Sequence, residues 1–190
     1  MIWWPESIPT LTVGTTTLRP MRSTDAEDIY KAVQDPTIPK FTTLPEDYPI
    51  DLAIEFATTR NVNSHLNKTE LVFVMEDSEL ASTGYPYSDG FAGVISLHSI
   101  DIPNHRAEIG YWMAKEARGK GIGTRAGSMI TEYGLMTMGF NRIDGIVDVR
   151  NEPSKQLLLN AGYEFEGIMK KYVTRRDGSQ LDMALFAATK

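Results

Sequence analysis

Hydrophobic residues follow two spacings along the chain, and these spacings predict runs of strands with helices between them. β-Branched and aromatic residues predict strands over residues 15–22, 69–76, 91–99, 107–113, 142–149, 163–174 and 180–187. Apolar residues at helical spacing predict helices over residues 23–33, 50–60, 122–138 and 152–162. The resulting order, β-α-α-β-β-β-α-β-α-β-β, predicts an α+β fold built on one mixed sheet.

Local signals define the ends of several of these elements. Thr24 and Glu27 have the spacing of a capping box at the start of the first helix. One face of the second helix is predicted to carry Ile50, Ala53, Ile54 and Ala57. Residues 37–49 are rich in proline and are expected to form a loop. Gly139 is expected to end the long helix, and Asp177–Gly178 predicts a hairpin turn between the last two strands.

Composition favours a single domain that comprises residues 1–190. Of these residues 42% are hydrophobic and 23% are charged, which is enough for one substantial core. No linker rich in proline, serine or glycine divides the chain. The formal net charge of -6 argues against a nucleic-acid partner, because nucleic-acid binding normally requires a basic face.

Features that the sequence lacks exclude several functional classes. It contains no cysteine, which excludes disulfides, thiolate zinc sites and a cysteine nucleophile. The stretch MIWWPESIPT has no basic region of a signal peptide, and no apolar run is long enough to span a membrane. We therefore expect a cytoplasmic protein without membrane contact. His65, His98 and His105 lack metal-ligand spacing, so no metal is expected, and His98 is expected on a strand face rather than in a proton relay.

Glycines and cations gather at the start of the long helix, in the stretch EARGKGIGTRAGSMI. Free amides at a helix N-terminus form an anion site with the helix dipole, and glycine lets the backbone approach a phosphate closely. Arg118, Lys120 and Arg125 would add positive charge there. The segment RGKGIGT, Arg118–Thr124, therefore fits a pyrophosphate cradle, and a flexible surface turn is the alternative.

Two common nucleotide-binding motifs do not account for this stretch. The P-loop pattern G-x-x-x-x-G-K-[ST] is absent. Gly121, Gly123 and Ala126 satisfy the dinucleotide pattern G-x-G-x-x-A, with Asp144 downstream. That fingerprint requires its first glycine directly after a buried parallel strand, whereas the polar stretch AKEARGK intervenes here. We interpret the match as accidental.

The pattern Arg118-x-x-Gly121-x-Gly123 after a strand resembles instead the acetyl-CoA motif of the GNAT superfamily of N-acetyltransferases. Three segments resemble its ribosomal-protein N-terminal acetyltransferase (RimJ/RimL-like) branch: LRPMRSTDAEDI, AEIGYWMAKEARGKGIGTRA and VRNEPSKQLLLNAGYEFEG. The resemblance covers about residues 18–186 and leaves residues 1–17 outside it.

The resemblance implies the GNAT fold, in which a parallel pair of strands splays apart and holds the pantetheine arm of CoA. These strands would be residues 107–113 and 142–149. It implies acetyl-CoA as co-substrate, bound by Trp112, Met113, Arg118, Gly119, Lys120, Gly121, Ile122, Gly123, Thr124 and Asn151. It also implies direct attack of the acceptor amine on the thioester, which agrees with the absence of cysteine.

Three residues are the candidates for catalysis. Glu108, on the first splayed strand, would be the base for the amine; a solvent-facing side chain or an ion pair with Arg106 is the alternative. The resemblance to the RimJ/RimL-like branch also implies that Ser154 would donate a hydrogen bond to the departing thiolate, in place of the helix tyrosine of many family members, which this helix lacks before Tyr163. Asn151 would hold the pantetheine arm or the substrate amide. Helix capping is the alternative role for both Ser154 and Asn151.

The sequence thus predicts an acetyl-CoA-dependent N-acetyltransferase that acts on a primary amine. The resemblance and the acidic composition favour the N-terminal α-amine of a peptide or protein. Two alternatives stay open: an acetyltransferase for a small amine such as a polyamine, amino acid or antibiotic, and a non-catalytic acyl-CoA-binding sensor. The sequence does not decide the acceptor, the acyl-chain preference or the oligomeric state, a homodimer included.

Overall fold

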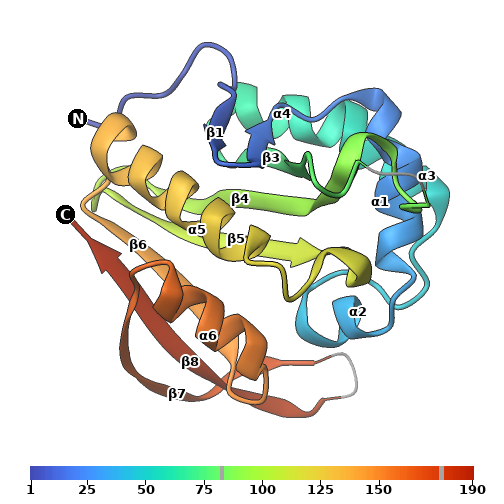
Figure 1. Ribbon diagram of the computed structural model, residues 1–190. Coiled ribbons are helices and arrows are strands. Elements are labelled where there is room, and N and C mark those ends of the chain that lie inside the picture. The colour runs from blue at the N-terminus through green and yellow to red at the C-terminus, as the bar shows by residue number, and fades with distance from the viewer. Residues whose placement is uncertain (82–83, 176–177) are drawn as a thin grey trace.

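One mixed sheet of eight strands forms the centre of the molecule, and its strands lie in the order β1-β2-β3-β4-β5-β6-β8-β7 (Figure 1). The computed structural model describes residues 1–81, 84–175 and 178–190. The strands are β1 Leu11–Val13, β2 Thr16–Arg19, β3 Leu71–Asp77, β4 Phe91–Asp101, β5 Arg106–Met113, β6 Arg142–Asp148, β7 Glu164–Thr174 and β8 Gln180–Thr189. Within this sheet β5 and β6 run parallel and the other neighbours run antiparallel, which confirms the predicted mixed sheet.

Helices cover both faces of the sheet. The α-helices are α1 Ala26–Val33, α2 Thr37–Phe41, α3 Ile50–Glu55, α4 Asn61–Leu66, α5 Ile122–Glu132 and α6 Glu152–Asn160. Two π-helical segments extend them, η2 Phe56–Arg60 between α3 and α4 and η5 Tyr133–Met138 after α5. The 3-10 turns are η1 Ser23–Asp25, η3 Ser88–Gly90 and η4 Lys115–Ala117. Figure 1 shows α5 and α6 in front of the sheet and α4 behind it; no helix among the described residues is long and apolar enough to cross a bilayer.

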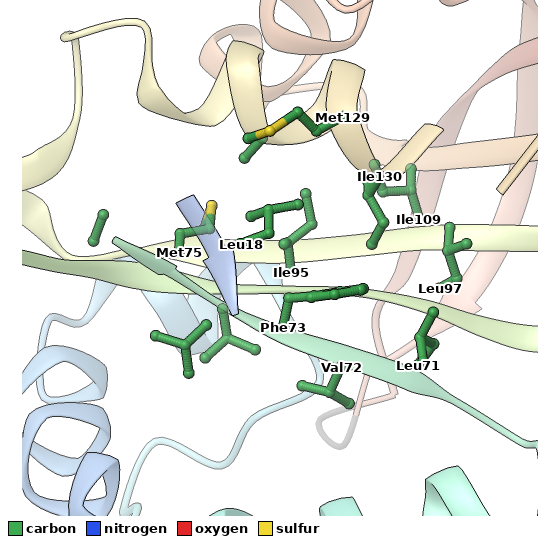
Figure 2. Close-up of a cluster of buried hydrophobic side chains, with 14 of the residues drawn as sticks. Leu18, Leu71, Val72, Phe73, Met75, Ile95, Leu97, Ile109, Met129 and Ile130 are labelled. Carbon is green, nitrogen blue, oxygen red and sulfur yellow. The ribbon is translucent and has the colours of Figure 1, made fainter. Parts of the chain in front are cut away.

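Alternation along β3, β4 and β5 divides their side chains between the two helical layers. Figure 2 shows the side chains that point toward Met129 and Ile130 of α5: Phe73, Ile95, Leu97 and Ile109. All four are at most 4% exposed. Val72 points to the opposite face of the sheet (Figure 2). Because burial of each such side chain contributes roughly 1.5–3 kcal/mol, this alternation also fixes which polar side chains face away from α5.

The start of the first helix differs from its prediction. The expected capping box of Thr24 and Glu27 is wrong. The carboxylate of Asp25 instead accepts a hydrogen bond from the Arg22 backbone N–H at 2.6 Å. Glu27 points along α1 and forms an ion pair with Lys31 at 2.8 Å. The shorter aspartate, placed one turn after Arg22, therefore satisfies the Arg22 amide, two residues before the predicted cap Thr24.

The region that follows α1 is more helical than predicted. Residues 37–49 begin with α2, and the second helix continues through η2 and α4 as far as Leu66. Two residues on its predicted apolar face, Ala53 and Ala57, are buried. Ile50 and Ile54 are 40% and 47% exposed, because α1 packs against α3 on the alanine side. Small side chains at this contact leave the isoleucine side in solvent.

The two glycine-based predictions for chain reversal have different outcomes. Gly139 ends η5 in the left-handed conformation, with φ of 86°, which confirms that prediction. Asp177 lies outside the described residues. On either side of it, the Arg175 N–H donates to the Ser179 carbonyl at 2.8 Å.

The parallel strands β5 and β6 pair over a short stretch and then separate. The paired residues are Arg106 with Arg142, Ala107 with Ile143, and Glu108 with Asp144. Beyond this point β5 stays paired with β4 as far as Met113, and β6 stays paired with β8 as far as Asp148. The predicted splayed pair is therefore confirmed. Past Glu108, the edge of β5 that faces β6 has no strand partner among the described residues, and we call this gap the splay.

Candidate active site

The glycine loop, Arg118–Thr124, leads from η4 after β5 into α5. Gly119 and Gly121 both have φ of +75°, in the left-handed region that favours glycine. The first backbone hydrogen bond of α5 runs from the Arg125 N–H to the Gly121 carbonyl at 3.0 Å. Within the described part of the chain, the amides of residues 119–124 have no backbone or side-chain acceptor. These N–H groups therefore form an anion site at the positive end of a helix.

Gly123 serves packing and not backbone conformation. A Cβ atom there would lie 2.6 Å from Cδ1 of Leu157 on α6 and 2.8 Å from Sδ of Met113 on β5. The next residue toward the loop, Ile122, is 1% exposed, so its side chain belongs to the core and only its amide faces the loop. Glycine is thus required in the motif for two separate reasons. Gly119 and Gly121 have left-handed backbone conformations, and Gly123 allows α5 to pack closely against α6 and β5.

Arg118 is engaged within the protein. Its Nε and Nη2 donate to the Met113 carbonyl at 3.1 and 2.8 Å, and Nη1 donates to Oγ1 of Thr37 at 2.9 Å. Nη2 also forms an ion pair with Asp35 at 2.8 Å. All three guanidinium nitrogens therefore have acceptors that connect the glycine loop to the end of β5 and to the start of α2.

The other two cations near the loop differ from each other. Arg125 donates to Oγ1 of Thr16 at 2.7 Å and to Oδ2 of Asp77 at 3.1 Å, so it connects α5 to β2 and β3. Lys120 is exposed, and its ammonium group has no partner among residues 1–81, 84–175 and 178–190. Of the three predicted cations, Lys120 is the one that is available to a phosphate.

The residues predicted for the pantetheine arm lie on both sides of the splay. Trp112 and Met113 form the end of β5, the first side. Asn151 precedes α6 on the second side, and its Oδ1 accepts the Ser154 N–H at 3.3 Å. Asn151 therefore does cap α6. Its side-chain NH₂ group has no partner in the described residues and is available as a donor.

A side-chain hydrogen bond spans the splay. The hydroxyl of Tyr111, on β5, lies 2.7 Å from Oγ of Ser154 on α6 and donates to the Ser154 carbonyl at 3.2 Å. Burial raises the pKa of Tyr111 to about 12, and the hydrogen bond with Ser154 opposes this effect. Sequence reasoning missed Tyr111 as a member of this pair. The sequence signal for its position was the spacing of two residues from Ile109, which places both side chains on the face covered by α5 and α6.

Glu108 lies where the splay opens, opposite His98 on β4 and Asp144 on β6. The alternative of an ion pair with Arg106 does not occur, because Arg106 Nε binds Asp101 at 3.1 Å. Burial, and then the negative charge of Asp144, raises the pKa of Glu108 to about 7. The described residues contain no group of three or more His, Asp or Glu that could hold a metal ion. The site therefore offers a carboxyl group that titrates near neutral pH.

Alternation along β5 places Glu108 and Tyr111 on opposite faces of the strand. Glu108 shares its face with Gly110, whereas Tyr111 shares its face with Ile109, which points toward α5 (Figure 2). A group held in the splay would therefore meet a carboxyl from one side and a hydroxyl pair from the other. This arrangement allows one proton to leave and another to arrive without competition for the same position.

Residues between Thr43 and Arg60 line a pocket of about 220 Å³. Arg60 lies 4.0 Å from Glu70, whose carboxylate accepts a hydrogen bond from Oγ of Ser96. Helix α2 precedes this pocket and is held at both ends. Arg118 binds Thr37 at its start, and Arg175 donates to the Lys40 carbonyl at 2.7 Å near its end. Helix α2 thus connects the glycine loop to the β7–β8 hairpin.

Comparison with known proteins relates this arrangement to one family. The family model described as "Acetyltransferase (GNAT) domain" matches residues 15–164. "Uncharacterized N-acetyltransferase p20" of Bacillus licheniformis is 26% identical over 177 residues, which are 92% of each chain. Spermidine N(1)-acetyltransferase of Escherichia coli K12 is 24% identical over 151 residues, 79% of this chain and 73% of that one. The ribosomal-protein-serine acetyltransferase of the same strain is 32% identical over 83 residues, 44% and 46% of the two chains.

A solved structure extends the comparison to three dimensions. The microcin C7 self-immunity acetyltransferase MccE, crystallised with acetyl-CoA and AMP, superposes with a TM-score of 0.78 and 25% sequence identity. The match covers 94% of both chains. The fold described above is therefore shared almost in full with a protein whose crystal contains acetyl-CoA.

Proposed function

The chain belongs to the GNAT acetyltransferase family and is an N-acetyltransferase that uses acetyl-CoA; from this premise we propose that it acetylates the N-terminal α-amine of a peptide or protein. The observation that carries this proposal is Glu108, a carboxyl group with a pKa of about 7 at the opening of the splay. Its acidity matches that of an α-amine better than that of an alkyl amine.

The glycine loop and the splay would hold the donor. The free amides of residues 119–124 and the ammonium group of Lys120 would bind the diphosphate of CoA. The pantetheine arm would lie along the unpaired edge of β5, within reach of the free NH₂ group of Asn151. Acetyl-CoA then supplies an activated acyl carbon in the gap between β5 and β6.

Glu108 would act as the base for the acceptor amine. Amine pKa values are about 7.7–8.0 for an α-amine and about 10.4 for a lysine side chain. Proton transfer to a group of pKa about 7 therefore costs about 1–1.4 kcal/mol for an α-amine but about 4.6 kcal/mol for an alkyl amine. A base of this strength suffices for the α-amine and is weak for the alkyl amine.

The Tyr111–Ser154 pair would stabilise the departing sulfur from the opposite face. A thiol has a pKa near 8.5, so a thiolate is a moderate leaving group that benefits from a hydrogen bond. Tyr111, with a pKa of about 12, is too weak an acid to give up its proton at neutral pH. Because the Tyr111 hydroxyl donates toward Ser154, the Ser154 hydroxyl would donate the hydrogen bond to the sulfur, and the sulfur would take its proton from water. The chain has no cysteine that could form an acyl-enzyme, which supports direct attack by the amine.

A polyamine is the second candidate acceptor. The carboxylate of Asp144, the neighbour of Glu108 on β6, would favour an acceptor with more than one positive charge. The similarity to a spermidine acetyltransferase supports the same alternative. A polyamine is the less favoured acceptor, because Glu108 is a weak base for an alkyl amine.

Release of CoA thiol in the presence of acetyl-CoA and an acceptor tests the proposal. The chain contains no cysteine, so a thiol reagent detects only CoA. We expect turnover with short peptides that have free N-termini, and none with the same peptides after N-terminal acetylation. Turnover with spermidine but not with peptides at pH 7 would replace the first acceptor class with the second. A complete lack of thiol release with all amines would refute the proposal.

A further inference from the structure

The imidazole of His98 lies across Gly110 at the opening of the splay. A Cβ atom on Gly110 would lie 2.7 Å from Nε2 and 2.9 Å from Cδ2 of His98. Gly110 does not have positive φ, so its backbone conformation does not require glycine. The glycine is therefore explained by the space that the imidazole occupies. Gly110 lies beyond Glu108, the last residue of β5 that is paired with β6.

The two nitrogens of this imidazole have different surroundings. Nδ1 lies 2.9 Å from Oγ of Ser99, whereas Nε2 faces Gly110 and has no hydrogen-bond partner in the described part of the chain. His98 is also the direct neighbour of Glu108 across the β4–β5 pair, and such neighbours have Cβ atoms about 4.5–5.5 Å apart. Nε2 and the Glu108 carboxyl therefore face the same small region.

Burial, and not the neighbouring charges, favours the neutral ring of His98. Burial lowers the pKa of His98, and the charge of Glu70 opposes this effect. Glu70 is itself close to Arg60, and Glu108 and Asp144 continue the row of titratable groups on β5 and β6. A neutral imidazole whose Nδ1 is bonded to a hydroxyl can present the lone pair of Nε2 toward the splay.

The acceptor amine gives up two protons in the reaction. An ammonium acceptor loses one proton before it can attack and a second as the C–N bond forms and the C–S bond breaks. One of these protons balances the CoA sulfur and the other is released to water. On the basis of the acetyltransferase function proposed above, we infer that Glu108 takes the first proton and Nε2 of His98 takes the second. His98 is thus a further catalytic residue, and Gly110 is the residue that positions it.

Substitutions at both positions test the inference by CoA thiol release. We expect H98Q to lower kcat by about tenfold or more, since positioned proton acceptors contribute roughly 10²–10⁴ and Glu108 remains. G110A should lower kcat similarly, because its methyl group displaces the imidazole, while KM for acetyl-CoA changes less than about twofold. The double variant H98Q/G110A should be no slower than H98Q alone. H105Q, at a histidine on the turn between β4 and β5, is the matched control and should retain wild-type kcat.

Chemical rescue separates a proton-accepting role from a structural one. H98A leaves space for a small base, so added imidazole should restore part of its kcat in a pH-dependent manner, and should not accelerate the wild type. Wild-type turnover together with undiminished kcat in H98Q and G110A would overturn the inference and leave the proposed function intact. Loss of kcat in H98A without rescue, with an unfolding temperature equal to that of the wild type, would also overturn it. Absence of thiol release by the wild type would instead contradict the proposed function.

Discussion

The Tyr111 hydroxyl lies 2.7 Å from Oγ of Ser154, and this contact joins β5 to α6 across the gap between two parallel strands. Among the described residues, neither hydroxyl forms a side-chain hydrogen bond within its own strand or helix. The pair lies on the opposite face of β5 from Glu108. The group that removes a proton would therefore lie on one side of a substrate held between the strands. The groups that stabilise the leaving atom would lie on the other side.

We predict that Y111F and S154A each lower kcat by about 10- to 100-fold. Hydrogen bonds to charged groups contribute roughly 1.5–3 kcal/mol, and the thiolate would develop this charge only as the C–S bond breaks. Acetyl-CoA affinity should change by less than about threefold, because the bond forms late in the reaction. Steady-state kinetics together with calorimetric CoA binding would check this.

Tyr163 provides the matched control for that prediction. Its hydroxyl also makes a buried hydrogen bond, to Oγ1 of Thr131 at 2.7 Å, but it lies beyond the end of α6. Y163F should lower the free energy of unfolding by about 1 kcal/mol and leave kcat unchanged. Equal losses of kcat in Y163F and Y111F would show that the hydroxyl at the splay has no special role.

We predict that replacing different glycines of the loop affects different properties, CoA affinity in one case and thermal stability in the other. G121D should weaken CoA binding by about 30-fold or more, because it adds a negative charge beside the amides at a residue with φ of +75°. G123A should mainly lower the unfolding temperature, since its methyl group would overlap with Leu157 and overpacking costs typically 1–3 kcal/mol. Calorimetric binding and thermal unfolding of each variant measure the two effects.

Gly162 is the control for backbone strain at these positions. It has φ of +94°, and a Cβ atom there would contact nothing within 4 Å. G162D should therefore show the cost of a left-handed aspartate while CoA affinity stays at the wild-type value. An unaltered CoA affinity in G121D would refute the anion site at the glycine loop.

We predict that Arg118 influences both substrates through its partners. R118Q and D35N should each raise KM for acetyl-CoA and for the acceptor by about three- to tenfold, because both remove the connection between the glycine loop and α2. The ion pair is partly exposed, so a double-mutant cycle should give a coupling of about 0.5–1 kcal/mol. K31Q, which removes the exposed pair of α1 with Glu27, should change neither KM. Unchanged KM for the acceptor in R118Q would contradict this role.

The features that local sequence determines were predictable. Strands with clear alternation and the helix that follows the glycine loop were found near their actual bounds, because period and turn residues reflect neighbouring positions. The glycine loop was recognised from a contiguous motif. The capping box failed for a local reason: Asp25 and Glu27 are both acidic, and the spacing alone could not rank them.

The features that depend on distant residues were not predictable. Arg118 contacts Thr37, which is 81 residues away, and Tyr111 contacts Ser154, which is 43 residues away. Such contacts depend on strand order and on how far β5 and β6 stay paired, and a single sequence specifies neither directly. Arg118 therefore looked like a free cation in the sequence, and no sequence signal paired Tyr111 with Ser154.

We predict that Glu108 links activity and stability to pH in opposite directions. Its pKa of about 7 in the folded protein lies above the ordinary glutamate value of 4.5, so the protonated form favours folding. This stability is complete below pH 4.5 and is lost as pH rises through 7, in total by about 3 kcal/mol. Activity needs the ionised form, so kcat/KM of the wild type should rise through pH 7.

E108Q and D144N test this linkage together. E108Q should lose most of its kcat/KM yet unfold at a higher temperature than the wild type at pH 8, and this difference should vanish near pH 4 because the wild-type carboxyl is then neutral. D144N removes the negative charge that helps to raise the pKa of Glu108, so the rise of kcat/KM should move to lower pH. If E108Q were less stable than the wild type at pH 8, or if D144N left the pH profile in place, Glu108 would not be the base that titrates near neutrality. Another residue on the same face of β5 would then have to be the base for the acceptor amine.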